Sequence, residues 1–331
     1  MPDDNLQAEV QQALGDHYTL EQELPRGGMS RVFVALENAL GRRVVIKVLA
    51  PELAASLSAE RFKREITLAA RLQHPHIVPL LSAGQAGPHL YYTMPFVDGE
   101  SLRQRMNRER PMAFVDISEI VEQIAGALAY AHGEGIVHRD IKPENVMFFH
   151  GQAVVLDFGI GKALISASTT ETEAEILHIT QVGMSLGTPT YVAPEQATGD
   201  PALDHRADLY ALGVVAYEML TGHPPFAGRS PQAVIEAHAK QMPEPIIARR
   251  ADVPKPLAAI VVRMLAKRPE DRPATGDEIV KALNIAVHTR HSGGGPVIDT
   301  LANAPVWIPW TIAAVATAAA IVMSVLYATR V

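Results

Sequence analysis

The sequence contains no cysteine among its 331 residues. Disulfide bonds, thiolate metal sites and thiol catalysis are therefore excluded, and a reducing compartment is compatible with the composition. An excess of positive charge is also lacking, because the formal net charge is −7, so no general affinity for nucleic acid is expected. The acidic start, residues 1–4, lacks the apolar core of a secretory signal. At this length the chain can form one large two-lobed domain or two small domains with a sizeable core.

One segment, residues 306–327, lacks charged side chains altogether. About twenty such residues suffice to span a bilayer core of about 30 Å. Trp307 and Trp310 lie at one end and Tyr327 at the other, where aromatic residues meet the membrane interface. We therefore expect a transmembrane helix, with a buried core helix as the alternative.

The flanks of this segment are short or loose. Residues 287–305 include a run of three glycines followed by proline and read as a flexible juxtamembrane linker. Residues 328–331 form a tail in which no external sensor domain is expected. Small residues recur four apart in the span at Ala313/Thr317 and Ala316/Ala320, which suggests helix pairing and a homodimer.

The apolar pattern before residue 287 changes from strands to helices. We expect residues 1–17 to form a short polar helix or a disordered lead. Strand patterns follow at 18–24, 31–36, 43–49, 77–82 and 89–94, with one helical pattern at 58–72. A break from Pro95 to Gly99 separates these from helical patterns at 114–132, 207–221, 231–241, 256–266 and 275–286. The sequence thus predicts an α+β fold with a β-rich lobe, 18–96, and a helical lobe, 97–286.

Acids, an amide and a lysine cluster in two loops of the second lobe. The first loop runs from His138 through Arg139, Asp140, Ile141, Lys142, Pro143 and Glu144 to Asn145; the second is Asp157-Phe158-Gly159. Two short apolar stretches between them, joined at 150–152, predict a hairpin that brings Asn145 and Asp157 to one end of a small sheet. Carboxylate and amide oxygens suit Mg²⁺, and the lysine suits a phosphate. The thirteen histidines show no HExxH-like spacing that would indicate zinc.

Other motifs stand at ordered positions along the chain. Gly27 and Gly28 lie in a turn between two strands, Lys47 lies inside an apolar strand, and Glu65 lies on the predicted helix eighteen residues later. Residues 187–195 read Gly-Thr-Pro-Thr-Tyr-Val-Ala-Pro-Glu. Taken singly, the glycine turn fits a plain hairpin, and Lys47 fits a solvent-exposed position on an edge strand. Their order over about residues 18–286 resembles the protein kinase signature set and is most similar to bacterial transmembrane Ser/Thr kinases of the Hanks type.

That resemblance implies a two-lobed kinase fold that binds ATP and Mg²⁺, with Mn²⁺ as an alternative ion. Lys47 would hold the α- and β-phosphates, with its ammonium fixed by Glu65, and Asp140 would accept the proton of the substrate hydroxyl. Lys142 would neutralise charge on the transferred phosphoryl group, and Asn145 and Asp157 would ligate the metal. The implied nucleotide-binding residues are Leu24, Gly27, Gly28, Val32, Val45, Lys47, Met94, Val97 and Met147.

The resemblance also assigns residues around the acceptor. Lys142, two residues after Asp140, is the Ser/Thr pattern, and Thr188 would help to bind the acceptor segment. Glu195 would form a buried structural ion pair with Arg272. Asp208 would tie the helix 207–221 to the backbone of the His-Arg-Asp loop.

Regulation and location are further expectations from this resemblance. Arg139 would bind a phosphate on the activation loop, with Thr180 the first candidate and Ser185 the second; a merely polar loop is the alternative. Since ATP is cytoplasmic, the kinase domain would face the cytoplasm from a single-pass anchor in the cell membrane. The expected partners are protein substrates with Ser or Thr acceptors, ATP and the membrane.

Two departures from the pattern leave other functions open. Pro25 and Ser30 stand where the glycine loop usually has glycine, and these departures bear on the affinity for ATP more than on activity. A membrane-anchored pseudokinase or ATP-binding scaffold is the main alternative. A small-molecule phosphotransferase is a second alternative, against which the complete Ala-Pro-Glu segment at 193–195 argues.

Overall fold

The computed structural model of the chain describes residues 3–27, 30–50, 54, 59–158, 189–200 and 203–291. Its contacts divide the chain into Met1–Ala286 and Val287–Val331. No helix within these described ranges is long and apolar enough to cross a membrane. The predicted membrane segment, 306–327, lies outside them, as do residues 292–305 of the predicted linker; its first residues, 287–291, belong to a helix that ends at His291.

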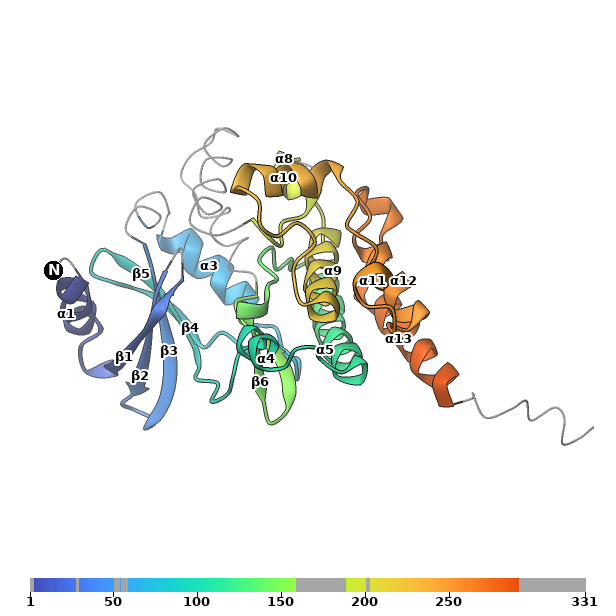
Figure 1. Cartoon of the computed structure of the whole chain (residues 1–331). Helices are drawn as coiled ribbons and strands as arrows, with labels where there is room; N and C mark the ends of the chain where they lie inside the picture. The colour runs from blue at the N-terminus through green and yellow to red at the C-terminus, as the bar shows by residue number, and fades with distance from the viewer. Residues whose placement is uncertain are drawn as a thin grey trace, which may run out of the picture. The chain divides into compact units, whose positions relative to one another are not determined.

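An antiparallel five-stranded sheet forms the first lobe, with the strand order β1-β2-β3-β5-β4 (Figure 1). The strands are β1 (Tyr18–Gly27), β2 (Ser30–Glu37), β3 (Arg42–Leu49), β4 (Ser82–Ala86) and β5 (His89–Pro95). The expected strand at 77–82 is wrong, because Ile77 forms only an isolated bridge to Val155 and β4 begins at Ser82. Side chains in β3 alternate between the two faces of the sheet, which places Lys47 on one face and Ile46 on the other.

A helix covers each face of this sheet. Phe62 and Ile66 of α3 (Ala59–Ala69) pack with Val45 and Met94 in one buried cluster. On the other face, Val10 and Leu14 of α1 (Asp3–Leu14) pack in a second cluster that contains Phe33 and Ile46. The lead of the chain is therefore helical, and a short 3₁₀ turn, η1 (Gly15–His17), connects it to β1.

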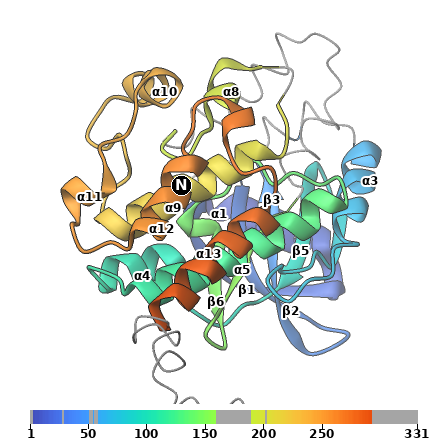
Figure 2. The same ribbon diagram turned by 90° about the vertical axis from the view of Figure 1, so that its right-hand side faces the viewer.

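The second lobe is built around α9 (Arg206–Thr221), whose residues from Ala207 to Leu220 are all buried. The other α-helices among the described residues of this lobe are α4 (Leu102–Arg108), α5 (Phe114–Gly133), α8 (Pro194–Thr198), α10 (Pro231–Lys240), α11 (Ile246–Arg249), α12 (Lys255–Met264) and α13 (Gly276–His291). Figure 2 shows α13 lying across α5. The approach is close, because a Cβ atom at Gly276 would lie 2.1 Å from the carbonyl oxygen of Ala125. Only glycine permits this contact.

The predicted hairpin in this lobe is confirmed. It consists of β6 (Val146–Phe149) and β7 (Gln152–Val155), which pair in antiparallel register. The 3₁₀ turn η2 (Pro143–Asn145) leads into β6, and the amide of Leu156 donates to the carbonyl oxygen of Asn145 over 2.9 Å. The two polar loops are therefore joined at the same end of the hairpin.

Candidate functional site

The backbone of the 138–145 loop is held by one buried carboxylate. Asp208, on α9, accepts hydrogen bonds from the amide of His138 at 2.8 Å and from the amide of Arg139 at 2.7 Å. The ring of His132 lies 2.8 Å from the same carboxylate. Burial alone would raise the pKa of Asp208, but His132 and the backbone hydrogen bond from Arg139 hold it below its ordinary value. The expected tie between α9 and this loop is confirmed.

Two polar side chains of the loop converge at Asp140. Lys142 Nζ lies 2.6 Å from Asp140 Oδ2, and Asn145 Nδ2 donates to the same oxygen over 2.9 Å. Asn145 Nδ2 also donates to the carbonyl oxygen of Asp140 at 2.8 Å. Asp140 is thus oriented by a cation and an amide, while its own side chain remains about 60% exposed to solvent. An exposed, oriented carboxylate can accept a proton from a hydroxyl group placed beside it.

A second carboxylate, Asp157, joins the two lobes. Its Oδ2 forms an ion pair with Lys47 Nζ of β3, and its Oδ1 accepts a hydrogen bond from the hydroxyl of Tyr92 at 3.1 Å. Tyr92 lies opposite Lys47 in the β3–β5 register, and burial followed by the charge of Asp157 raises its pKa well above the ordinary value. The pairing of Lys47 with Glu65 stays a prediction, since the Glu65 side chain is outside the described residues.

The backbone is strained where these side chains are aimed. Arg139 has a φ of 70° and Asp157 a φ of 63°. Residues other than glycine seldom adopt this left-handed backbone conformation, and it persists only where surrounding contacts enforce it. For Arg139 the enforcing contact is the hydrogen bond from its amide to Asp208.

The predicted nucleotide-binding side chains gather in one apolar group. Val32, Val97 and Met147 pack against the buried cluster that contains Val45 and Met94. Val32 lies in β2, Val45 in β3 and Met94 in β5, whereas Val97 follows β5 and Met147 lies in β6. Both lobes therefore contribute to the group. Leu24 pairs with Val32 across β1 and β2, and the backbone of Gly27 pairs with Ser30. Gly28 lies outside the described residues.

The donor atoms fit a hard cation. Both hydrogen bonds that Asn145 donates use its amide nitrogen, which leaves the oxygen Oδ1 as the atom suited to ligate a metal. Asp157 supplies carboxylate oxygens from the facing loop. Oxygen donors of this kind suit Mg²⁺, which usually takes one or two carboxylates together with substrate phosphates. Within the described part of the chain, no group of three or more His, Asp or Glu residues is arranged to hold a metal.

A buried ion pair fixes the start of α8. Glu195 and Arg272 form two parallel hydrogen bonds, of 2.6 and 2.7 Å, and both residues are buried. The other three N–H groups of Arg272 donate to the carbonyl oxygens of Ala266, Arg206 and Lys267. All five donors of the guanidinium are therefore used, which offsets the cost of burying its charge. The expected structural pair is confirmed.

An unexpected polar network connects this region to the 138–145 loop. Arg103, on α4, donates to Glu144 at 2.7 Å and to Glu218 of α9 at 2.7 Å, and it also contacts the hydroxyl of Tyr191. That hydroxyl donates to Glu218 over 2.5 Å, and burial followed by the charge of Glu218 raises the pKa of Tyr191. Gln196 adds a further link by donating to the carbonyl oxygen of Arg139 at 3.2 Å. These hydrogen bonds thus hold the segment 191–196 in a fixed position relative to the 138–145 loop.

The Arg139 side chain has an unsatisfied donor. Its Nε atom is buried and has no hydrogen-bond partner among the described residues. Burial lowers the pKa of the guanidinium, and the charge of Asp208 opposes that shift. A buried cation with a free donor can bind an anion. The predicted phosphorylation sites, Thr180 and Ser185, and the predicted acceptor-binding residue Thr188 lie outside the described residues.

Comparison with known proteins gives the family. The protein kinase domain family matches residues 18–284. Serine/threonine-protein kinase PknB of Mycolicibacterium smegmatis is 41% identical over 295 residues, which cover 87% of this chain and 46% of PknB. Serine/threonine-protein kinase pkn3 of Myxococcus xanthus is 39% identical over 269 residues, covering 78% of this chain and 48% of that protein. The chain spans about half the length of the curated relatives it matches.

A solved structure agrees with these matches. The Mycobacterium tuberculosis PknI kinase domain aligns with a TM-score of 0.63 and 30% identity over 82% of this chain and 96% of the PknI chain. The Mycobacterium tuberculosis PknB sequence is likewise 40% identical over 293 residues. These matches confirm the resemblance inferred from the motifs, and the chain belongs to the protein kinase domain family, among bacterial serine/threonine kinases of the Hanks type.

Proposed function

We propose that this protein transfers the γ-phosphoryl group of ATP to serine and threonine hydroxyls of other proteins. One observation carries the proposal: Asp140 is oriented by Lys142 and Asn145, while Asp157 is paired with Lys47 of the other lobe. Proton acceptor, phosphate-binding lysine and metal-ligating oxygens are thereby gathered from both lobes. The names of the relatives, all serine/threonine-protein kinases, support the same activity.

Each residue has a distinct part in the proposed reaction. Asp140 accepts the proton of the acceptor hydroxyl at its carboxylate, and Lys142 offsets negative charge beside it. Lys47 binds phosphate oxygens and orients the nucleotide, while the apolar group around Val45 and Met94 excludes water from the base. Mg²⁺, held by Asn145 and Asp157, would neutralise phosphate charge.

The transfer is tested with radiolabelled ATP, Mg²⁺ and a generic basic protein substrate. We expect the wild-type chain to label serine and threonine, and Asp140→Asn to lower kcat by about 10²- to 10⁴-fold because the proton acceptor is lost. Asp157→Asn should likewise abolish transfer. Asp277→Asn is the matched control, since this exposed residue lies in the first turn of α13 and its substitution should leave the rate unchanged. Wild-type chain that binds ATP but labels no protein would favour a pseudokinase scaffold and contradict the proposal.

Activation through Arg139 is a second part of the proposal. A phosphate on Thr180 or Ser185 would accept from the unsatisfied guanidinium and order the loop near the acceptor. Such charge-assisted pairing is worth about 1.5–3 kcal/mol, so dephosphorylation should lower activity roughly ten- to hundredfold.

Mass mapping after incubation with ATP, followed by phosphatase treatment, checks this regulation. We expect phosphate on Thr180 or Ser185, and we expect Arg139→Gln to have low activity that phosphatase does not lower further. The idea would be wrong if no residue from 165 to 188 carried phosphate, or if phosphatase lowered Arg139→Gln and wild type by the same factor.

Membrane tethering is the third part, and it is supported by the uncharged run at 306–327 with aromatic residues at both ends. In this arrangement the kinase domain faces the cytoplasm, and small-residue pairs in the span favour a homodimer. Full-length chain should float with membranes in a density gradient, and deletion of residues 306–331 should abolish flotation. Deletion of 328–331 alone is the control. Full-length chain that stays at the bottom of the gradient would refute the anchor.

A further inference from the structure

The hydroxyl of Tyr92 reaches Asp157 from inside the first lobe. Tyr92 lies in β5, and its ring packs in the buried cluster that contains Val45 and Met94, so that only 3% of the residue is exposed. Its hydroxyl donates to Oδ1 of Asp157 over 3.1 Å. A buried tyrosine presents one polar atom at the end of a rigid ring, because only two side-chain torsions set its position. The phenol is therefore a fixed donor to this carboxylate.

Asp157 is held by two donors on adjacent strands. Lys47 of β3 lies directly opposite Tyr92 of β5 in the antiparallel register, so both side chains lie on the same face of the sheet. Lys47 Nζ pairs with Oδ2 of Asp157, and the Tyr92 hydroxyl binds Oδ1. Each carboxylate oxygen thus has its own donor, which fixes the rotation of the carboxylate as well as its place. Asp157 needs such contacts, because its φ of 63° is a conformation that its surroundings must enforce.

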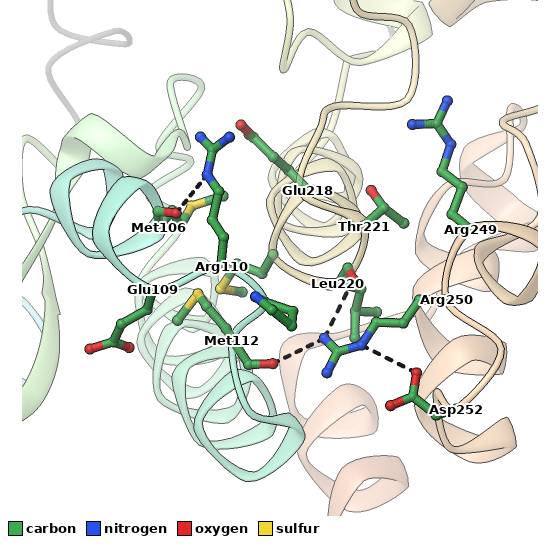
Figure 3. Close-up of a pocket in the computed structure, with 13 residues that line it drawn as sticks. Met106, Glu109, Arg110, Met112, Glu218, Leu220, Thr221, Arg249, Arg250 and Asp252 are labelled. Atoms are coloured by element: carbon green, nitrogen blue, oxygen red, sulfur yellow. Dashed lines mark hydrogen bonds and ion pairs between the residues drawn. The ribbon is translucent and has the colours of Figure 1, made fainter.

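A second carboxylate, Glu218, is bound in a similar way and serves as a comparison. It accepts hydrogen bonds from the Tyr191 hydroxyl at 2.5 Å and from Arg103 at 2.7 Å. Figure 3 shows Glu218 beside a pocket of about 460 Å³ at the C-terminal ends of α4, α9 and α11. No member of this group is assigned to nucleotide or metal, so its contacts have a structural role. The group around Asp157 differs, because two of its members are assigned to ATP and Mg²⁺.

The second partner proposed for Lys47 gives Tyr92 its role. In the proposed reaction the ammonium group of Lys47 binds phosphate oxygens of ATP, so phosphate competes with Asp157 for it. Tyr92 carries no charge, and the proposed reaction gives it no phosphate to bind. Its hydrogen bond can therefore hold the carboxylate of Asp157 while the nucleotide engages Lys47. Hydrogen-bond partners of metal-ligating carboxylates orient the ligand, and their loss typically costs about 10- to 100-fold in metal affinity.

We propose that Tyr92 is a positioning residue that orients the carboxylate of Asp157 for the metal ion. This role rests on the proposed function, in which Asp157 ligates Mg²⁺. Tyr92 acts through Asp157, and the hydroxyl is the part that matters. Its ring belongs to the apolar cluster, where the ring of phenylalanine would pack in the same way. The substitution Tyr92→Phe therefore removes the hydrogen bond and keeps the packing.

Metal binding is tested without phosphoryl transfer, on the full-length chain in detergent. Mn²⁺ is titrated in the presence of a non-hydrolysable ATP analogue and followed by electron paramagnetic resonance. We expect Tyr92→Phe to raise the dissociation constant of Mn²⁺ about 10- to 100-fold. Tyr91→Phe is the matched control, because Tyr91 is the neighbouring residue of β5 and packs with the cluster on the opposite face of the sheet. It should change the constant less than twofold.

Binding of the same analogue in EDTA separates positioning from damage to the fold. Tyr92→Phe should bind the metal-free analogue within about twofold of wild type. An equal or higher affinity of Tyr92→Phe for Mn²⁺ would overturn the positioning role alone, as would an equal loss of metal and metal-free analogue binding. Asp157→Asn should abolish Mn²⁺ binding. Wild-type chain that binds no Mn²⁺, or unchanged binding in Asp157→Asn, would refute the metal site on which both the proposed function and the role of Tyr92 rest.

Discussion

The structure of the site depends on the carboxylate of Asp208 in the middle of the helical lobe. Only 1% of this residue is exposed, and its oxygens bind two consecutive backbone amides of the 138–145 loop. These bonds hold Arg139 in a left-handed conformation that its side chain would otherwise disfavour. Asp140 follows directly, so its position depends on this bend. Because α9 is buried along nearly its whole length, its side chains can act as a fixed reference for the loops around it.

The same helix connects the segment around Tyr191 to the 138–145 loop. Glu218, near its C-terminal end, binds Tyr191 and Arg103, and Arg103 reaches Glu144 within the loop. Arg272 makes the corresponding contacts at the N-terminal end of α9, where it binds both Glu195 and the carbonyl oxygen of Arg206. Removing one partner from a buried pair of this kind typically costs about 3–5 kcal/mol, because the remaining charge stays buried. The network therefore favours one relative position of the 138–145 loop, the segment 191–195 and α9.

Much of this arrangement was predictable from the sequence, where residue type and spacing determine a contact. The hairpin was predicted from two short apolar runs, whereas the tie from Asp208 and the Glu195–Arg272 pair were implied by the resemblance to protein kinases; the structure contains all three. Tyr92 was missed, although its place opposite Lys47 could have been found from the register of two alternating strands. The error at residues 77–82 has a physical cause: apolar residues there pair with β7 through a single bridge rather than joining the sheet. The pocket lined by residues 106–112, 218–222 and 249–252 could not be predicted, because its first segment lies more than one hundred residues before the other two.

The central claim is that Asp208 positions the reactive loop, and the most direct test is the kcat of Asp208→Asn for phosphorylation of a serine peptide. The substitution keeps the size of the side chain but weakens the charge-assisted hydrogen bonds to the loop amides, which are worth about 1.5–3 kcal/mol. We expect kcat to fall roughly ten- to hundredfold while the KM for ATP stays within about twofold, because Lys47, Val45 and Met94, which are proposed to bind the nucleotide, lie in β3 and β5 rather than in the 138–145 loop. Near-ultraviolet circular dichroism would establish that the variant is folded. A folded variant with the wild-type kcat would contradict the account.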